Sequence, residues 1–217
     1  MHTDLLLDIF DGSREFTFAK GQTIDPFNST DKLYYIRKGY VKRYLINKFG
    51  ETAIQGIYGP GYIFPLTGIF ISLFNQRVYS GEEEYFFEAM TDITLLRTDT
   101  KAFMERAEVN PEVYRAILFE TGQRLQSAIH HFENTSFRHA YKKVVHQLVF
   151  LAQQFGQAEP RGIKLMLPLT QQDLADTIMI SRETVSHVIV RLRDMGLILP
   201  TKLIIIPDIN KLKAVYS

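Results

Sequence analysis

The chain has 217 residues, of which 46% are hydrophobic and 23% charged, a composition typical of folded globular proteins and not of disordered ones. The absence of cysteine excludes disulfides, cysteine-bound zinc, cysteine-held iron–sulfur clusters and thiol catalysis. No apolar run is long enough to span a bilayer, and the first residues carry an acid where a secretory signal has basic residues. We therefore expect a cytoplasmic protein with no membrane partner.

The net charge of +1 is unevenly distributed. Residues 139–217 hold ten Lys and Arg against six Asp and Glu, whereas residues 1–138 hold fifteen against eighteen. The C-terminal part is therefore the better candidate for contact with phosphates.

The first hundred residues alternate between short β-type runs and turn signals about ten residues apart. Turns of the hairpin type are predicted at 37–39 and 49–51, and the last two runs are predicted to form a strand pair. This spacing indicates an antiparallel barrel or sandwich. Strands are expected at 16–18, 23–24, 33–36, 40–46, 53–58, 84–90 and 93–97.

The pattern changes to a helical period at Pro111, which suits a first helical turn, and the helix is predicted to run to about Thr135. One set of its residues recurs in alternating steps of four and three, as in the seam of a two-stranded coiled coil. A single helix lying on its own domain would give the same pattern. The seam consists of Tyr114, Leu118, Thr121, Leu125, Ala128, Phe132 and Thr135.

A second helix is predicted from Arg138 to Phe155, with a loop at 157–162 and a strand-like run at 163–167. Gly156 ends the helix. Its predicted apolar face comprises Val144, Val145, Leu148, Val149, Leu151 and Ala152.

The residues from 169 to 199 are the most informative about function. Thr170 and Asp173 have the spacing of a capping box at the start of a short helix that ends at Ile178. Ser181 is predicted to cap a second helix that runs from 182 to 195 and ends before Gly196. Two helices joined by so short a turn have the geometry of a DNA-reading helix-turn-helix.

The second of these helices has an apolar face, with Val185, Val188, Ile189 and Leu192 predicted to point inward. The opposite stripe contains the candidate base-contacting residues, whose side chains can bond to base edges in the major groove. Side chains near helix starts are candidates for phosphate contacts. The base-contact candidates are Arg182, Glu183, Ser186 and His187, and the phosphate-contact candidates are Thr170, Gln171, Ser181, Thr184 and Lys202.

Any helical hairpin with a solvated polar face would look similar, so the context matters. The runs 197–199 and 203–206 flank Pro200-Thr201-Lys202 and predict a β-hairpin with a basic tip. A hairpin there would be a wing, placed to touch the DNA backbone beside the groove.

The sequence resembles the Crp–Fnr (catabolite activator protein-like) transcription regulators. The helix-turn-helix resemblance lies in TQQDLA at 170–175, SRETVS at 181–186 and GLI at 196–198, and the β-roll resemblance in LYYIRKGYVK at 33–42 and GPGYIF at 59–64. It implies an α+β chain with an N-terminal antiparallel β-roll (a cyclic-nucleotide-binding-like jelly roll), a long dimerisation helix and a C-terminal winged helix-turn-helix. The implied domains are 1–110, 111–137 and 138–217. His187 stands where the family often has Arg, which leaves the base preference open there.

The resemblance suggests a cyclic nucleotide as effector, but the residues argue against cyclic AMP. In members that bind it, a Gly-Glu pair follows the Pro-Gly turn and the Glu bonds the ribose; here Pro65 and Leu66 stand in that place. The Arg-Ser pair that holds the cyclic phosphate falls near Glu83 and Glu84, whose charge would repel it. The register is uncertain across 72–80, and Arg77 is an alternative phosphate partner. On the long helix, Ala128 and Ile129 replace the polar residues that meet the purine.

The effector is therefore unknown, and a protein without an effector is an alternative. An effector pocket, if there is one, is predicted to be lined by Tyr62, Phe64, Phe70 and Ile129, although such aromatic clusters are more often core. No metal site is expected, because His130 and His131 are adjacent and His139 and His146 are two turns apart, and no cofactor is expected.

The sequence thus predicts a dimeric, sequence-specific DNA-binding transcription regulator, with two-fold symmetric double-stranded DNA as its target. The family resemblance adds RNA polymerase as a candidate partner. The alternative is a small-molecule-binding sensory protein that acts through protein contacts. We expect no enzyme activity, because no catalytic constellation was found. The operator, the target genes and the choice between activation and repression stay open.

Overall fold

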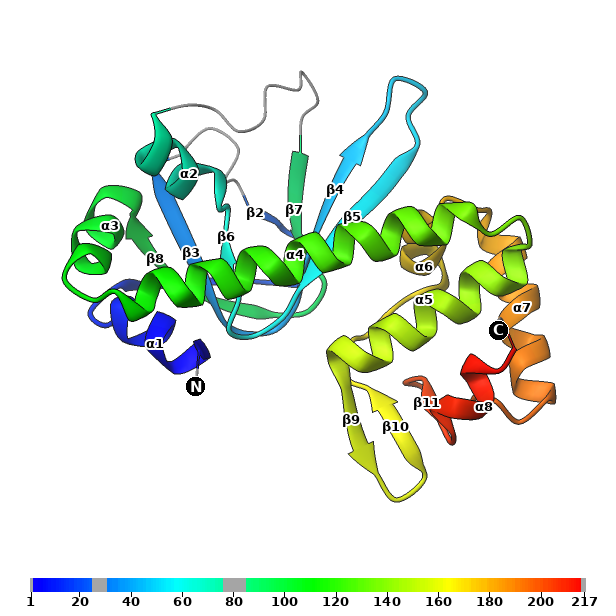
Figure 1. The fold of residues 1–217 in the computed structure, drawn as a ribbon. Helices are drawn as coiled ribbons and strands as arrows, with labels where there is room; N and C mark the ends of the chain where they lie inside the picture. Colours follow the sequence, from blue (N-terminus) through cyan, green and yellow to red (C-terminus); the bar gives the residue numbers. More distant parts are fainter. Residues whose placement is uncertain (1, 25–30, 76–84, 216–217) are drawn as a thin grey trace. The chain divides into compact units, whose positions relative to one another are not determined.

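The computed structural model describes residues 2–24, 31–75 and 85–215 and forms two compact units, Met1–Gln126 and Ser127–Ser217 (Figure 1). Helix α4 (Glu112–Ser136) contributes its first part to the first unit and its last part to the second. The predicted α+β class, with an antiparallel β-domain, a long helix and a C-terminal helix-turn-helix, is confirmed. No helix of the described residues is both long and apolar enough to cross a membrane.

The first unit contains two four-stranded antiparallel sheets. One has the order β1 (Arg14–Phe18), β8 (Ile93–Asp99), β3 (Lys32–Lys38) and β6 (Ile63–Phe64). The other has the order β2 (Thr23–Ile24), β7 (Tyr85–Ala89), β4 (Val41–Ile46) and β5 (Thr52–Tyr58). Two sheets of this kind bury one apolar layer between them.

Strand β3 shows why the sheets stack as they do, because it is buried on both faces. Tyr34 and Ile36 belong to the cluster that includes Val41, Tyr58 and Phe87 of the second sheet. The alternate residues of β3 belong to the other cluster, which joins this sheet to helices α1 (His2–Ile9), α2 (Thr67–Phe74), α3 (Thr100–Glu108) and the start of α4. Successive side chains of a strand point to opposite faces, so an unbroken apolar run fits a doubly covered strand.

The hairpin at 49–51 is confirmed, since β4 and β5 pair directly. The strands on either side of residues 37–39 and 90–92 form as predicted, but their predicted pairing is wrong, because β3 and β8 lie in one sheet and β4 and β7 in the other. Both turns cross between sheets, and they lie together: Tyr40 N donates to Thr91 Oγ1 at 3.1 Å, and Met90 N to Tyr40 O at 2.8 Å. Gly39 has a φ of 88°, and a Cβ there would come within 2.6 Å of Asp92 O. Only glycine lets the crossing chains approach so closely.

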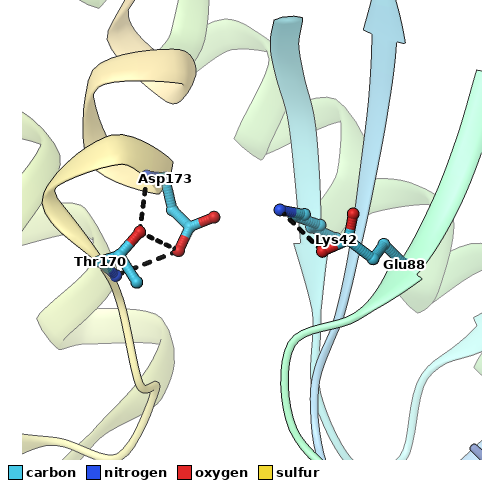
Figure 2. Close-up of polar contacts among 4 residues, drawn as sticks. All are labelled: Lys42, Glu88, Thr170 and Asp173. Carbon is cyan, nitrogen blue, oxygen red and sulfur yellow. Dashed lines mark hydrogen bonds and ion pairs between the residues drawn. The ribbon is translucent and has the colours of Figure 1, made fainter. Parts of the chain in front are cut away.

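The sheet formed by β2, β7, β4 and β5 has a half-buried ion pair between two neighbouring strands (Figure 2). Lys42 of β4 lies opposite Glu88 of β7, and Lys42 Nζ is 3.0 Å from Glu88 Oε1. In the same two strands the rings of Tyr44 and Phe86 stack at 5.4 Å. Directly opposed charged and aromatic pairs of this kind fix the register of antiparallel strands.

The second unit is built on α5 (Ala140–Phe155), which starts two residues later than predicted. All six residues of its predicted apolar face are buried. They pack with α6 (Gln171–Ile178), α7 (Arg182–Asp194) and α8 (Ile209–Lys213). A small sheet of order β11 (Ile205–Ile206), β10 (Gly162–Leu165) and β9 (Gly156–Glu159) completes the unit.

Two predictions for this unit are wrong in detail. The expected loop at 157–162 is instead the end of strand β9, a turn at Pro160 and Arg161, and Gly162, the first residue of β10, which pairs with β9. The wing is not a regular hairpin: of its two arms only β11 is a strand, and it pairs with β10. The arms are joined by a hydrogen bond from Leu199 N to Ile205 O at 2.9 Å. Strand β11 forms its regular strand pairing with β10 and not with the other arm.

Candidate nucleic-acid interface

The helix pair α6–α7 has a capping arrangement at each helix start. Thr170 Oγ1 accepts from Asp173 N at 3.0 Å, and Asp173 Oδ2 accepts from Thr170 N at 3.1 Å, so the predicted capping box is confirmed (Figure 2). Ser181 Oγ accepts from Thr184 N at 3.2 Å and caps α7 as predicted. These bonds satisfy backbone donors that have no partner inside the helices and fix where each helix begins.

The turn between the two helices consists of residues 179–181, and its first residue sets the angle. Met179 is in the left-handed conformation, with φ 56° and ψ 53°, and Ile180 N donates to Ala175 O at 3.2 Å. A side chain other than glycine or asparagine costs about 1 kcal/mol in this conformation. The chain accepts that cost because the turn brings the apolar faces of α6 and α7 onto one core.

The inner face of α7 is buried as predicted, at Val185, Val188, Ile189 and Leu192. Of the four base-contact candidates, Arg182, Glu183 and His187 are exposed and Ser186 is partly buried. Hydrogen bonds from its own backbone N–H and from Ser181 lower the pKa of Glu183, so this exposed carboxylate is ionised. The first two turns of α7 therefore present a cation, an anion and an imidazole to solvent, beside a partly buried hydroxyl.

The phosphate-contact candidates lie in three places. Thr170 and Ser181 are exposed, but their hydroxyls are already bonded in the two caps. Gln171 and Thr184 are partly buried at the starts of α6 and α7, and Lys202 is exposed between the arms that lead to β11. Their contact with DNA stays a prediction.

Sequence reasoning missed the guanidinium of Arg191. It lies on the exposed side of α7, over the ring of Tyr141 of α5, with Cζ 4.5 Å from the ring centroid. Tyr141 lies at the start of α5, fifty residues before Arg191, so only the fold shows that they meet.

The predicted seam of α4 is largely uncovered within the chain. Leu118, Leu125 and Phe132 are 72%, 61% and 77% exposed, and Ala128 is also exposed. Tyr114 packs against the first unit's core, and the hydroxyls of Thr121 and Thr135 bond to carbonyls of their own helix. Three large apolar side chains in line on one helix are unusual on a monomer's surface.

Comparisons with known proteins agree with this geometry. Residues 142–215 match the model of the Crp-like helix-turn-helix domain. Over 90% of the chain it is 27% identical to a "CRP-like cAMP-activated global transcriptional regulator" of Mycobacterium tuberculosis, covering 84% of that protein. Over 86% it is 25% identical to the "Global nitrogen regulator" of a Synechocystis strain, covering 80% of that protein.

The whole fold is shared as well. The structure of CooA from Carboxydothermus hydrogenoformans superposes with a TM-score of 0.75 at 24% identity, over 97% of this chain and 90% of that one. The helix-turn-helix match and the fold similarity cover both units. Residues 142–215 form a Crp-like helix-turn-helix domain, and the chain is similar over most of its length to transcription regulators of the Crp–Fnr type.

The four predicted pocket residues lie in different surroundings. Phe64 is fully buried in the core between the sheets, and Tyr62 packs against that core. Phe70 packs against the cluster formed with the helices, and Ile129 belongs to the second unit and is half exposed. Leu66, which the resemblance aligns with the ribose-binding Glu of cyclic-AMP-binding proteins, is 6% exposed in the helix-side cluster. Residues 76–84, with Arg77, Glu83 and Glu84, lie outside the described residues.

A charged pair on α4 was not among the predicted site residues. Arg124 lies over the ring of Tyr58, with Cζ 4.7 Å from the centroid, and donates a hydrogen bond to Ile63 O. Glu120 is 7% exposed, and its Oε2 is 3.8 Å from Arg124 Nη2. Their spacing of four on a predicted helix was a visible signal of an ion pair. That the pair reaches into the first unit's core depends on the fold.

Burial changes the protonation of this pair. It raises the pKa of Glu120 to about 7, against the lowering effect of Arg124. It also raises the pKa of Tyr62, and the charge of Glu120 adds to that shift. A carboxyl group with a pKa near neutrality makes this region of the first unit sensitive to pH.

We predict that the substitution Glu120→Gln stabilises the protein increasingly as the pH rises. The native pKa of about 7 lies above the ordinary 4.5, so stability due to the protonated carboxyl is fully present below about pH 4.5 and is lost as the pH rises through 7. The size of the shift corresponds to about 3 kcal/mol at most. Urea unfolding of both proteins from about pH 5 to about pH 8 measures this difference.

The matched control is Glu112→Gln, which makes the same change at the exposed start of the same helix, outside the core. The pKa of His130 and of His146 is lowered, which makes stability rise with pH, but this contribution is common to both proteins and cancels in the difference. A Glu120→Gln difference that is flat or of opposite sign would show that the carboxyl is not held protonated.

Proposed function

We propose that this regulator acts as a homodimer on a two-fold symmetric duplex, with one α7 in the major groove of each half-site. The observation that carries the proposal is the polar stripe on the first two turns of α7, which is exposed while the opposite face is buried. A recognition helix contacts base edges with its N-terminal residues, which is where this stripe lies.

The base contacts are assigned by chemistry. Arg182 can donate two bonds to O6 and N7 of guanine, and ionised Glu183 can accept from the amino group of cytosine. Ser186 and His187 can each donate or accept, so they tolerate several bases. Specificity is therefore assigned mainly to the first two residues of α7.

The phosphate contacts are assigned to groups around this helix. The starts of α6 and α7 offer backbone N–H groups and the side chains of Thr170, Gln171, Ser181 and Thr184, and helix N-termini attract anions. Lys202 supplies a full positive charge in the segment before β11. These contacts set the position of the protein on the duplex and carry no sequence information.

The dimer is assigned to α4. Leu118, Leu125 and Phe132 recur with a spacing of seven and are exposed, and a second α4 related by two-fold symmetry would cover them. Symmetric dimers present two reading helices to a palindromic site.

The effector of the sensory unit is proposed to be something other than cyclic AMP. Leu66 fills the ribose-binding position with a buried apolar side chain, and Arg124, a cation of α4, is already engaged with Tyr58, Glu120 and Ile63 O. The names of the relatives differ in this respect, one being described as cAMP-activated and another as a nitrogen regulator. We also propose a cytoplasmic location and RNA polymerase as a partner, because a transcription regulator works beside the chromosome and the polymerase.

We predict that Arg182→Ala and Lys202→Ala weaken DNA binding in different ways. Loss of the Arg182 contact should remove about 1–3 kcal/mol of discrimination at one base pair, which is about a 5- to 150-fold loss of specificity. Loss of Lys202 should lower affinity for all sequences and reduce the salt slope by about one. Binding isotherms on a selected site and its single-base variants, at several salt concentrations, measure both effects. Unchanged site preference in Arg182→Ala would disprove the placement of α7.

A charge in the α4 seam should dissociate the dimer. Leu125→Asp would place a carboxylate in the apolar interface and should weaken dimerisation by about 3 kcal/mol, or roughly 100-fold. Sedimentation should show twice the chain mass of 25.1 kDa for the native protein and a single chain mass for the variant. Gln126→Asp, one residue along and outside the seam, should stay dimeric. Equal behaviour of the two variants would place the interface elsewhere.

Calorimetric titration of the full chain with cyclic AMP should show no saturable heat. The Mycobacterium tuberculosis relative, titrated under the same conditions, is the positive control that its name suggests. Micromolar binding to the present chain would overturn our interpretation of Leu66 and Arg124.

A further inference from the structure

Three potential metal ligands lie close together between the last turns of α4 and helix α5. His130 and Glu133 are one helical turn apart on α4, and His146 projects from α5. One ligand atom of each residue lies within 4.8 Å of the others. All three residues belong to the second unit, so the cluster does not depend on the placement of the first.

Spacing along one helix could not predict this cluster. The pairs that the sequence offers, His130 with His131 and His139 with His146, are poor chelators. The pair that the fold makes lies across two helices, with the rings of His130 and His146 stacked at 4.2 Å and 12°. His130 and His146 are both partly buried.

Buried neighbours hold the His130 ring in place. Its Nε2 is 3.1 Å from Oε1 of Gln147, which is 3% exposed. Asn134, also 3% exposed, donates to that same oxygen at 3.4 Å and to Lys143 O at 3.2 Å. On its other side the ring stacks on Phe150 at 3.8 Å. Metal-binding histidines are commonly oriented in this way by a bond from the ring to a carbonyl oxygen.

The types of the three ligands suit a metal of intermediate softness. Two imidazoles and one carboxylate are ligands that Zn²⁺, Co²⁺ and Ni²⁺ accept. An imidazole nitrogen binds a metal in the plane of its ring, so bonds of about 2.0–2.2 Å would require His146 to turn out of its stack on His130 and Glu133 to move toward both rings. Glu133 is exposed and free to rotate toward the rings.

We propose that His130, Glu133 and His146 form a binding site for a divalent transition-metal ion, with Zn²⁺ as the best fit. Three protein ligands leave a coordination position for water or another ligand. The ion would join the last turns of α4 to α5 inside the unit that contains α6 and α7. The proposal does not depend on DNA binding and is tested without it.

The test is a titration of the metal-free full-length protein with Co²⁺, followed by its visible absorption, and then competition with Zn²⁺. We expect one ion per chain, a spectrum of low-symmetry coordination that Zn²⁺ abolishes, and a Zn²⁺-dependent rise in melting temperature. His146→Gln and Glu133→Gln should each weaken Co²⁺ binding at least about tenfold. Glu133 is exposed, so its replacement leaves the fold intact, and circular dichroism checks this.

The matched controls are His139→Gln and His187→Gln, which remove exposed histidines outside the cluster and should bind Co²⁺ like the native chain. Absence of saturable Co²⁺ binding would overturn the proposal and leave the cluster as packed rings. Binding that survives in both His146→Gln and Glu133→Gln would also overturn it, because the metal would then be held elsewhere.

Discussion

The structure of the second unit depends on the burial of one apolar face of α7. Val185, Val188, Ile189 and Leu192 pack with α5 and α6, and removing them from water is the main favourable term that holds α7 in place. Once that face is inside, helical geometry leaves Arg182, Glu183 and His187 outside. The cost of the left-handed Met179 is accepted because a longer turn would separate α6 from α7. The reading surface is therefore a consequence of the core beneath it.

In the first unit, strands that follow one another in the sequence belong to different sheets. Each of the two crossings, at 39–40 and 90–92, moves the chain from one sheet to the other, and the two crossings bond to one another. The resulting sandwich buries an aromatic-rich core, with Phe64 and Phe87 stacked at 5.0 Å. Phe64, which was predicted to line a pocket, is part of this core, and Glu120, Arg124 and Tyr62 are polar groups close to it on the side of α4.

Helix α4 has three different surroundings along its length. At its start Val113, Ala116 and Ile117 are buried in the first unit, in its middle Glu120 and Arg124 reach into that unit as a charged pair, and near its end His130 and Asn134 contact α5. The exposed stripe of Leu118, Leu125 and Phe132 runs along the helix beside all three. One helix therefore contributes to both units and carries the exposed stripe on which the proposed dimer depends. Substitutions on its different faces should separate these roles.

Local patterns in the sequence determined much of this protein. The capping box at Thr170, the cap at Ser181, the inward face of α7, the apolar face of α5 and the turn at 49–51 each depend on residues within a few positions of one another, and all are confirmed. The family resemblance had the same origin, because its motifs are short and ordered along the chain. Helices α1, α2 and α3 were not predicted, since their apolar residues serve a cluster whose other members come from distant strands.

What only the tertiary structure decided are the contacts between residues far apart in the chain. The sheet to which each of β3, β4, β7 and β8 belongs depends on which other elements bury the faces of that strand. The residues of the turns between these strands do not determine it. The pairing of β11 with β10, the approach of Arg124 to Tyr58 and the stacking of His130 on His146 follow from helix and strand packing in the same way. A spacing along one helix or strand predicts which residues share a face, but the identity of the opposite face depends on the whole chain.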